Sequence, residues 1–314
     1  VMAPTEILAR QHLQSFSHYL NHLGIKVAFL SGSQNTEERT TQVNLIESGE
    51  AQVVIGTHAL FQENVSFHNL ALVIIDEQHK FGVHQRLSLA QKASKTPHQL
   101  VMTATPIPRS LTMSAYADLD TSVIDELPPG RQKIKTVALS NNRRDELIEK
   151  IKKISNEGRQ IYWVCTLIEE SEALRAESAE NTFNYLSSNL EGIKVVMIHG
   201  RLTKSEKEEI MNDFVEGRID LLVATTVIEV GVNVPNASLM IVENAERLGL
   251  AQLHQLRGRV GRGAEKSACV LMYQSPLSES AKQRLDILRQ SHDGFMIAEK
   301  DLELRGPGEI LGTQ

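Results

Sequence analysis

Two adjacent acids, Asp76 and Glu77, directly follow an apolar run from Leu70 to Ile75. In an open α/β sheet, the carboxyl ends of the strands form the edge where ligands bind. An Asp at that edge can hold the magnesium ion of a nucleotide, directly or through water, and the neighbouring Glu can orient an attacking water. The alternative is an Asp that only caps the next helix, and the pair alone favours that simpler interpretation.

Three arginines form a second group within HQLRGRVGRG, residues 254–263. Arg257, Arg259 and Arg262 alternate there with Gly258 and Gly261. Arginine presents a fixed fork of donors that fits phosphate oxygens, and glycine allows a close approach of the backbone. Such arginines can neutralise charge on a transferred phosphate. A solvated basic helix end and a patch for DNA phosphates fit the spacing equally well.

Hydroxyl side chains follow other apolar runs. Thr103 and Thr105 lie in TATPIPR, and Thr225 and Thr226 lie in ATTVIEVGVNVPNA. In VMAPTEIL, Thr5 is placed to be the N-cap of a helix, whose free amides could equally face a nucleic-acid phosphate. Each of these signals is weak when taken alone.

The composition is that of a soluble globular protein of about two domains. The 314 residues are 41% hydrophobic and 23% charged, and no run approaches a membrane span. Because the net charge is −6, contacts with nucleic acid would need local basic patches. Cys165 and Cys269 lie in apolar runs, which predicts buried thiols and a cytoplasmic protein. The 11 histidines show no zinc spacing, and there is no G-x-S-x-G elbow.

Short apolar runs alternate with helical patterns along the chain, which predicts α/β lobes with parallel sheets. The run ELPPGRQKIK, residues 126–135, is rich in Pro, Gly and charge and is the candidate linker. We therefore expect one lobe over residues 1–138 and a second over residues 139–275. Residues 276–314 have a helical pattern without strands. The expected strands are VAFLSG, QVVIGT, LALVIID, HQLVMTAT, QIYWVCTL, KVVMIHG, DLLVATT, SLMIVENA and ACVLMYQ, and the clearest helices are Glu6–Leu23, Glu169–Leu190 and Lys204–Glu216.

Taken in order, VMAPTEIL, DEQH, TATPIPR, ATTVIEVGVNVP and HQLRGRVGRG resemble motifs Ia, II, III, V and VI of the superfamily 2 helicases. The finer resemblance is to the RecG family of ATP-dependent DNA helicases, through DEQHKFGVHQR, ELPPGR, YWVCTLIEESE and ENAERLGLAQLHQLRGRVGRG. It implies two RecA-like lobes with ATP in the cleft between them, then a helical hairpin with a translocation motif in DLELRGPGEILGTQ. The transcription-repair coupling factor is the close alternative. Its motif II usually has Glu where this chain has Gln78, and it lacks ELPPGR.

The resemblance implies roles for particular residues. Asp76 would bind Mg²⁺ directly or through water, Glu77 would activate water, and Arg259 and Arg262 would be arginine fingers. Contacts with ATP would come from Asp76, Gln255, Gly231, Asn233, Arg259 and Arg262. Coupling would involve Gln78, His79, Thr103, Thr105 and Arg305. The DNA contacts would be Pro4, Thr5, Gly56, Thr57, Thr225 and Thr226. Asn233 departs from the family, which usually has Asp, and an amide cannot balance a positive charge.

No phosphate loop of the form G-x-x-x-x-G-K-[ST] occurs, because the chain contains no Gly-Lys pair. In the family that loop precedes motif Ia, so we interpret the chain as a motor fragment that also lacks the N-terminal wedge domain. We expect this fragment alone to be inactive. We also expect the first lobe to show an exposed apolar groove beside Leu100–Ala104, where the strand leading into the loop would lie. Lobe 2 should be complete.

The leading hypothesis is a monomeric ATP-dependent helicase or translocase motor that remodels branched or duplex DNA, such as stalled forks and Holliday junctions, in recombination and repair. It would use ATP and Mg²⁺ and would have no membrane partner. The motor of a coupling factor is the second hypothesis. A non-catalytic DNA-binding remnant, which has lost its phosphate loop, is the third.

Overall fold

The computed structural model describes residues 1–82, 89, 92–93, 95–104, 120–128, 131–166, 172–225, 234–263 and 266–305. The chain folds into two compact units, Val1–Ala104 and Thr105–Gln314. Residues 105–119 and 129–130 lie outside the described part. The lobe boundary at residues 138 and 139 stays a prediction.

The first unit alternates strands with helices. Its first helix begins after Thr5, carries Glu6 in its first turn and buries Leu8 and Ala9. Helix and strand thus follow one another as the periodicity predicts. The elements are α1 (Glu6–Leu20), η1 (Asn21–Leu23), β1 (Lys26–Leu30), α2 (Thr36–Glu47), β2 (Ala51–Gly56), η2 (His58–Phe61), β3 (Leu72–Ile75), η3 (Gln78–Lys80) and β4 (His98–Val101).

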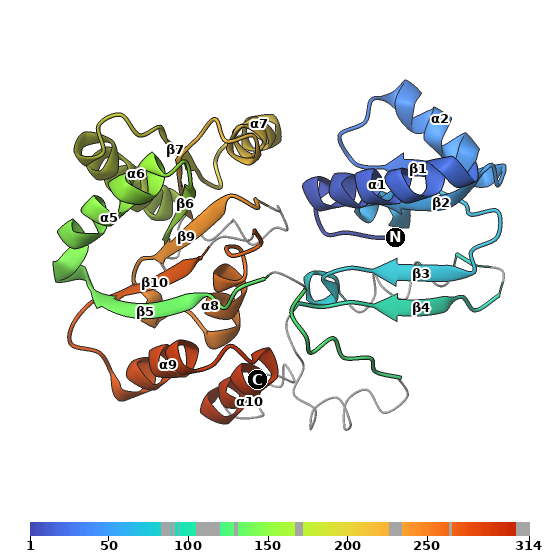
Figure 1. The fold of residues 1–314 in the computed structure, drawn as a ribbon. Coiled ribbons are helices and arrows are strands. Elements are labelled where there is room, and N and C mark those ends of the chain that lie inside the picture. The colour runs from blue at the N-terminus through green and yellow to red at the C-terminus, as the bar shows by residue number, and fades with distance from the viewer. Residues whose placement is uncertain are drawn as a thin grey trace. The chain divides into compact units, whose positions relative to one another are not determined.

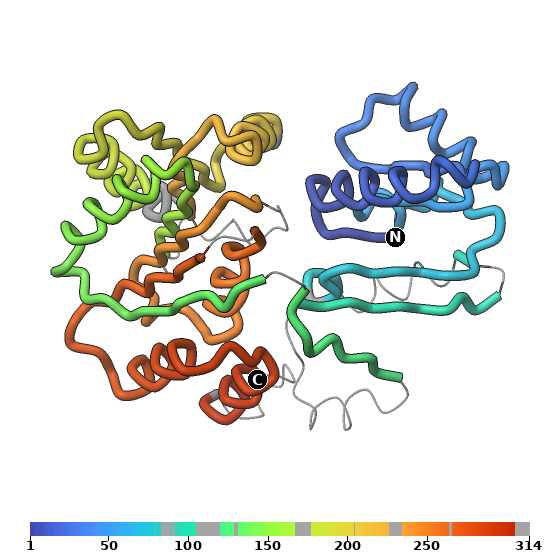
Figure 2. The backbone as a smooth tube through the Cα atoms, in the orientation of Figure 1, coloured from blue at the N-terminus to red at the C-terminus, as the bar shows by residue number. Residues whose placement is uncertain are grey.

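Residues 1–3, which we call the N-terminal rung, lie between two parallel strand pairs of the first unit. Strand β1 pairs with β2, and β3 pairs with β4. Met2 bridges Gly56 on one side and Ile75 on the other, with Met2 N donating to Ile74 O at 2.7 Å. The N-terminal end therefore lies between β2 and β3 (Figures 1 and 2). The resulting layer has the order β1, β2, rung, β3, β4.

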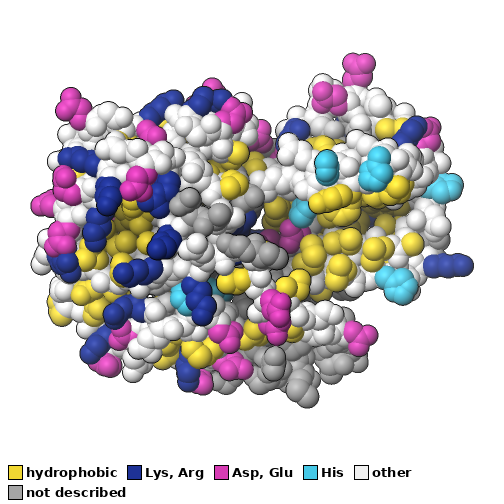
Figure 3. Space-filling model, in the orientation of Figure 1, with side chains coloured by type: hydrophobic (Ala, Val, Ile, Leu, Met, Phe, Trp, Pro, Cys, Tyr) yellow, Lys and Arg dark blue, Asp and Glu magenta, His cyan; other side chains and the backbone are white. Residues whose placement is uncertain are grey.

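Strand β4 has one strand neighbour, β3, within the described residues. Leu100 on β4 is 50% exposed, and Leu72 on β3 is 52% exposed. Figure 3 shows hydrophobic side chains at the surface below α1, over β3 and β4. The exposure of Leu100 agrees with an open apolar edge beside β4, and the groove beside Leu100–Ala104 stays a prediction.

The second unit is built on a six-stranded parallel sheet with the order β5-β10-β9-β6-β8-β7. Its central strands are β6 (Gln160–Cys165), β8 (Leu221–Thr225) and β9 (Ala237–Val242), and every residue in them is buried. The other elements are β5 (Lys135–Ser140), η4 (Asn141–Arg143), α5 (Arg144–Asn156), α6 (Glu172–Asn189), β7 (Val195–Ile198), α7 (Lys204–Val215), η6 (Ala245–Arg247), α8 (Leu250–Arg257), β10 (Ala268–Tyr273), α9 (Glu279–Gln290) and α10 (Gly294–Arg305).

The structure confirms the predicted α/β class and the parallel sheets. Strand β5 was not among the expected strands, and it includes Lys135, the last residue of the candidate linker. The linker itself stays a prediction. No described helix is long and apolar enough to cross a membrane.

Candidate functional site

Asp76 is held at the carboxyl end of β3 by three contacts. Its backbone N donates to Met2 O at 2.9 Å, and its side-chain Oδ1 accepts from the backbone N of Glu77 at 2.9 Å. Its other oxygen, Oδ2, lies 2.8 Å from Nε2 of His12 on α1. The carboxylate is therefore fixed in orientation, at the edge where the sequence predicts it.

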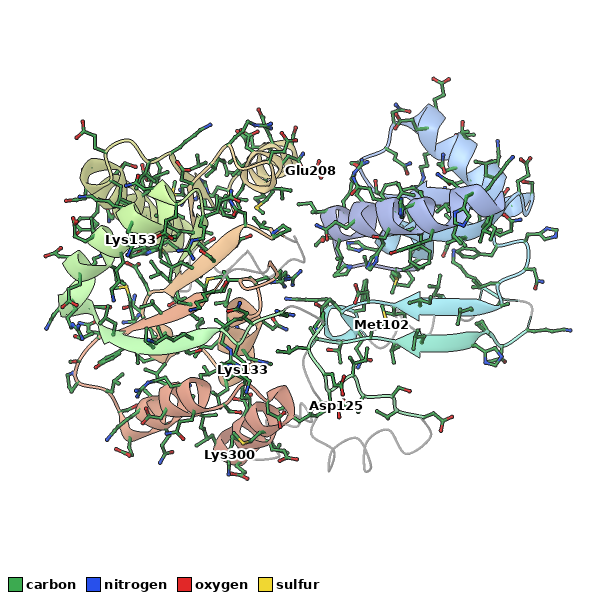
Figure 4. The ribbon with its side chains drawn as sticks, viewed as in Figure 1. Met102, Asp125, Lys133, Lys153, Glu208 and Lys300 are labelled. Carbon is green, nitrogen blue, oxygen red and sulfur yellow. The ribbon has the colours of Figure 1, made fainter. Side chains whose placement is uncertain are left out.

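Glu77 adopts the left-handed backbone conformation, with φ +50° and ψ +52°. This conformation is uncommon and costly for a residue other than glycine, and such residues cluster at functional sites. Oε2 of Glu77 accepts from the backbone N of Ala104 at 3.4 Å, and Gln78 N donates to Met102 O at 3.0 Å. Met102, labelled in Figure 4, follows the last residue of β4. The acids after β3 are thus tied to the residues after β4.

The residues predicted to face DNA in this unit come together at one edge. Ala3 N donates to Gly56 O at 3.0 Å, so Pro4 and Thr5 leave the sheet beside Gly56 and Thr57. A Cβ added to Gly56 would lie 2.3 Å from the carbonyl oxygen of Leu30, so the close strand packing requires glycine. Thr5 is the N-cap residue of α1 by position, but its hydroxyl makes no capping bond. The N-cap prediction is therefore wrong for the Thr5 side chain.

Sequence reasoning missed a polar cluster after β1. Ser31 is buried, and its Oγ lies 3.0 Å from Oγ of Ser33. Ser33 Oγ donates to the buried Glu6 of α1, which also accepts from Arg10 at 2.8 Å. The available signal was the Ser-Gly-Ser sequence directly after an apolar run, at the same edge as the acids. His12 gave no local signal, because its partner lies 64 positions away.

Arg257, in the second unit, is buried and donates from Nη1 to Leu288 O and Ser291 O, each at 2.8 Å. Burial lowers the pKa of its guanidinium. Burial, together with the nearby charge of Arg257, also lowers the pKa of His254 to about 4, so that His254 is neutral at pH 7. Arg257 therefore joins α8 to the end of α9, and its charge is engaged by backbone carbonyls.

The two other arginines differ in exposure. Arg259 is 6% exposed, whereas Arg262 is exposed and donates from Nε to Gly258 O at 3.3 Å. Burial raises the pKa of the Tyr162 phenol, and the charges of Arg259 and Arg262 lower it. Both arginines therefore lie near Tyr162 on β6.

The remaining predicted residues divide into two groups. The first group is described. Thr225 is the last residue of β8, and its Oγ1 is buried without a partner among the described residues. Gln255 lies near the end of α8, and Thr103 follows β4. The other group lies outside what the structure describes: residues Thr105, Thr226, Gly231 and Asn233, and the side chains of His79 and Arg305. All these assignments stay predictions.

The carboxylate of Asp76 has the donor chemistry that Mg²⁺ prefers, because Mg²⁺ binds oxygen and is commonly held by one or two carboxylates with substrate phosphates and water. Within the described residues each Asp76 oxygen makes one hydrogen bond, which leaves capacity for a further contact. No group of three potential metal-ligating side chains occurs among the described residues. The site therefore fits a Mg²⁺ ion that is bound to a nucleotide and that Asp76 would hold.

Two family models match the chain. The DEAD/DEAH box helicase model matches residues 1–114, and the helicase conserved C-terminal domain model matches residues 142–264. Together they contain Asp76 and Glu77 in the first match and Arg259 and Arg262 in the second.

The chain is 60% identical over its whole length to the ATP-dependent DNA helicase RecG of Escherichia coli strain K12, and covers 46% of that protein. It is 46% identical to RecG of Bacillus subtilis strain 168, again over the whole chain and 46% of the relative. The chain thus spans about half the length of these relatives.

Among solved structures, RecG bound to a three-way DNA junction matches with a TM-score of 0.80 and 45% identity, over 98% of this chain and 40% of that one. Yeast Dbp5 bound to RNA and ADP BeF3 matches with a TM-score of 0.66 at 16% identity, over 97% of this chain and 79% of that one, a likeness of fold alone. The parallel sheets are those of RecA-like helicase domains. Because the identity to RecG proteins extends over the full chain, the chain belongs to the family of the RecG ATP-dependent DNA helicases.

Proposed function

We propose that the protein is an ATP-dependent DNA helicase or translocase that remodels branched DNA, including stalled forks and Holliday junctions, in recombination and repair. The observation that carries the proposal is the 60% identity to E. coli RecG over the whole chain. A RecG protein bound to a three-way DNA junction supports branched DNA as the substrate. The motor works as a monomer in the cytoplasm and uses ATP with Mg²⁺.

Each part of the site has a role in this function. Asp76 holds the magnesium of the nucleotide, and Glu77 orients and deprotonates the attacking water. The bound ion would neutralise charge on the phosphate oxygens. Arg259 and Arg262 stabilise negative charge that develops on the transferred phosphoryl group. Pro4, Thr5, Gly56 and Thr57 are the proposed DNA contacts of the first unit, and Thr225 is a proposed DNA contact of the second unit.

The test measures ATP hydrolysis by the full-length gene product without DNA, with duplex DNA and with a three-way junction. We expect stimulation by the junction and strand displacement from it. Glu77→Gln should abolish both while nucleotide binding remains, because the amide cannot take a proton. Glu47→Gln, an exposed change at the end of α2, is the matched control and should leave both unchanged.

Two other results would point to the alternatives. Junction binding without any hydrolysis would support a non-catalytic DNA-binding remnant. Release of stalled RNA polymerase, without remodelling of junctions, would support a coupling factor.

A further inference from the structure

His12 connects the middle of α1 to the acid at the end of β3. Its Nε2 lies 2.8 Å from Oδ2 of Asp76, and the two side chains are 22% and 19% exposed. An ionised carboxylate only accepts hydrogen bonds, so Nε2 of His12 is the donor. A charge-assisted bond of this length is stronger than a neutral one.

The bond completes the support of the Asp76 side chain. Oδ1 accepts from the backbone N of Glu77 at 2.9 Å, and Oδ2 accepts from His12. With one donor on each oxygen, rotation of the carboxylate about its χ angles would break a bond. The unused lone pairs of both oxygens then point in fixed directions.

The helix that carries His12 is itself anchored. Leu8 and Ala9 pack in an apolar cluster with Phe29 and Ile55 of the sheet. In the first turn, buried Glu6 accepts from Arg10 and from Ser33 of the loop after β1. His12 therefore approaches Asp76 from a helix fixed to the sheet, and its imidazole can act as a rigid brace.

We propose that His12 is a positioning residue for Asp76 that sets the orientation in which this carboxylate receives a nucleotide-bound magnesium ion. The inference rests on the proposed function. Partners that orient a metal-binding side chain typically contribute about 10–100-fold to metal affinity. His12 touches neither nucleotide nor water in this role and acts through Asp76 alone.

The test uses the full-length gene product and compares His12→Phe with His12→Gln. Phenylalanine keeps a ring but removes the donor, whereas the glutamine amide places an N–H near the position of Nε2. His18→Phe, an exposed change on the same helix, is the matched control. Binding of N-methylanthraniloyl-ADP is titrated with MgCl₂, and binding in EDTA and thermal unfolding are recorded for each variant.

We expect His12→Phe to raise the MgCl₂ concentration at half-maximal binding by roughly tenfold. Binding in EDTA should not change, and His12→Gln should restore the magnesium response to within about threefold, a fraction of that loss. His18→Phe should match the wild type in every measurement.

Two results would overturn the inference. If His12→Phe lowers the unfolding temperature but leaves the magnesium titration unchanged, His12 only ties α1 to the sheet, and the proposed function stands. If the wild type itself binds the nucleotide without any response to magnesium, the proposed function fails and the positioning role fails with it.

Discussion

Asp76 and Glu77 are neighbours in the sequence but are held by different parts of the fold. Asp76 is bound by His12 of α1, whereas Glu77 turns through a left-handed backbone conformation and contacts the amide of Ala104 after β4. Two adjacent carboxylates with separate supports can perform separate tasks. One can bind the metal while the other orients a water molecule.

Arg259 and Arg262, the two proposed arginine fingers, should respond differently to substitution. Arg262→Ala should lower kcat for ATP by about 10³-fold or more, with a much smaller change in nucleotide Kd, because an arginine finger acts mainly on transition-state charge. Arg259→Ala should do the same and also lower the unfolding temperature, since Arg259 is buried. Steady-state hydrolysis, fluorescent nucleotide binding and calorimetry on the full-length gene product measure the three effects.

Arg218→Ala is the control, because this arginine is half-exposed and pairs with Asp213 on the surface of the same unit. Equal losses in nucleotide binding and turnover would indicate a ground-state phosphate contact instead. Normal turnover with weaker, less salt-sensitive DNA binding would indicate a DNA-phosphate patch.

The acids were predictable because their signal is local: an apolar run, then two carboxylates. The partner of Asp76 was not, since His12 reaches it across 64 positions and only the fold brings them together. Arg257 illustrates the opposite problem. Spacing alone groups it with Arg259 and Arg262, but its burial against the end of α9 gives it a different partner.

At the scale of elements, the strands that could be predicted are those with continuous apolar runs, which the central positions of a parallel sheet require. Strand β5 lies at the edge of the six-stranded sheet and is only partly buried. An edge strand needs apolar residues on fewer sides, so Lys135–Ser140 lacks the continuous run. Its position next to a Pro- and Gly-rich segment concealed it further.

Arg257→Met should loosen the end of α9. The substitution leaves two backbone carbonyls, Leu288 O and Ser291 O, without their buried donor, at a cost of about 1–3 kcal/mol. Hydrogen exchange of the full-length gene product should accordingly be roughly tenfold faster in the last turns of α9.

Arg289→Met provides the comparison on the same helix. Its exposed pair with Asp286 should contribute less than about 1 kcal/mol, so exchange in α9 should hardly change. If both variants behave alike, the bonds from Arg257 do not fix the end of the helix.

At the scale of the whole molecule, the two units differ in how their strands are supported. In the second unit, β8 lies between β6 and β7 and is buried along its length. In the described part of the first unit, β4 has β3 on one side only, and Leu100 is half-exposed. Burial of apolar surface stabilises the folded state by about 25 cal/mol per Å², and exposed apolar surface does not contribute this free energy.

The 314-residue chain should therefore show a difference in local stability. We expect backbone amides of β4 to exchange at least tenfold faster than those of β8, because exchange reports the free energy of local opening. Hydrogen-exchange mass spectrometry of peptides covering His98–Val101 and Leu221–Thr225 measures it. Equal protection of both strands would contradict the interpretation of β4 as a weakly supported edge.

The N-terminal rung has a consequence for the order of folding events. Each of its flanking strand pairs, β1 with β2 and β3 with β4, joins strands that follow one another along the chain. The contacts of Met2 with Gly56 and Ile75 close much longer loops. Because distant contacts form more slowly than near ones, the two pairs can assemble early and the rung can join them late. During unfolding, loss of the rung alone would separate the β1–β2 pair from the β3–β4 pair. We therefore expect the first unit to open first at the rung.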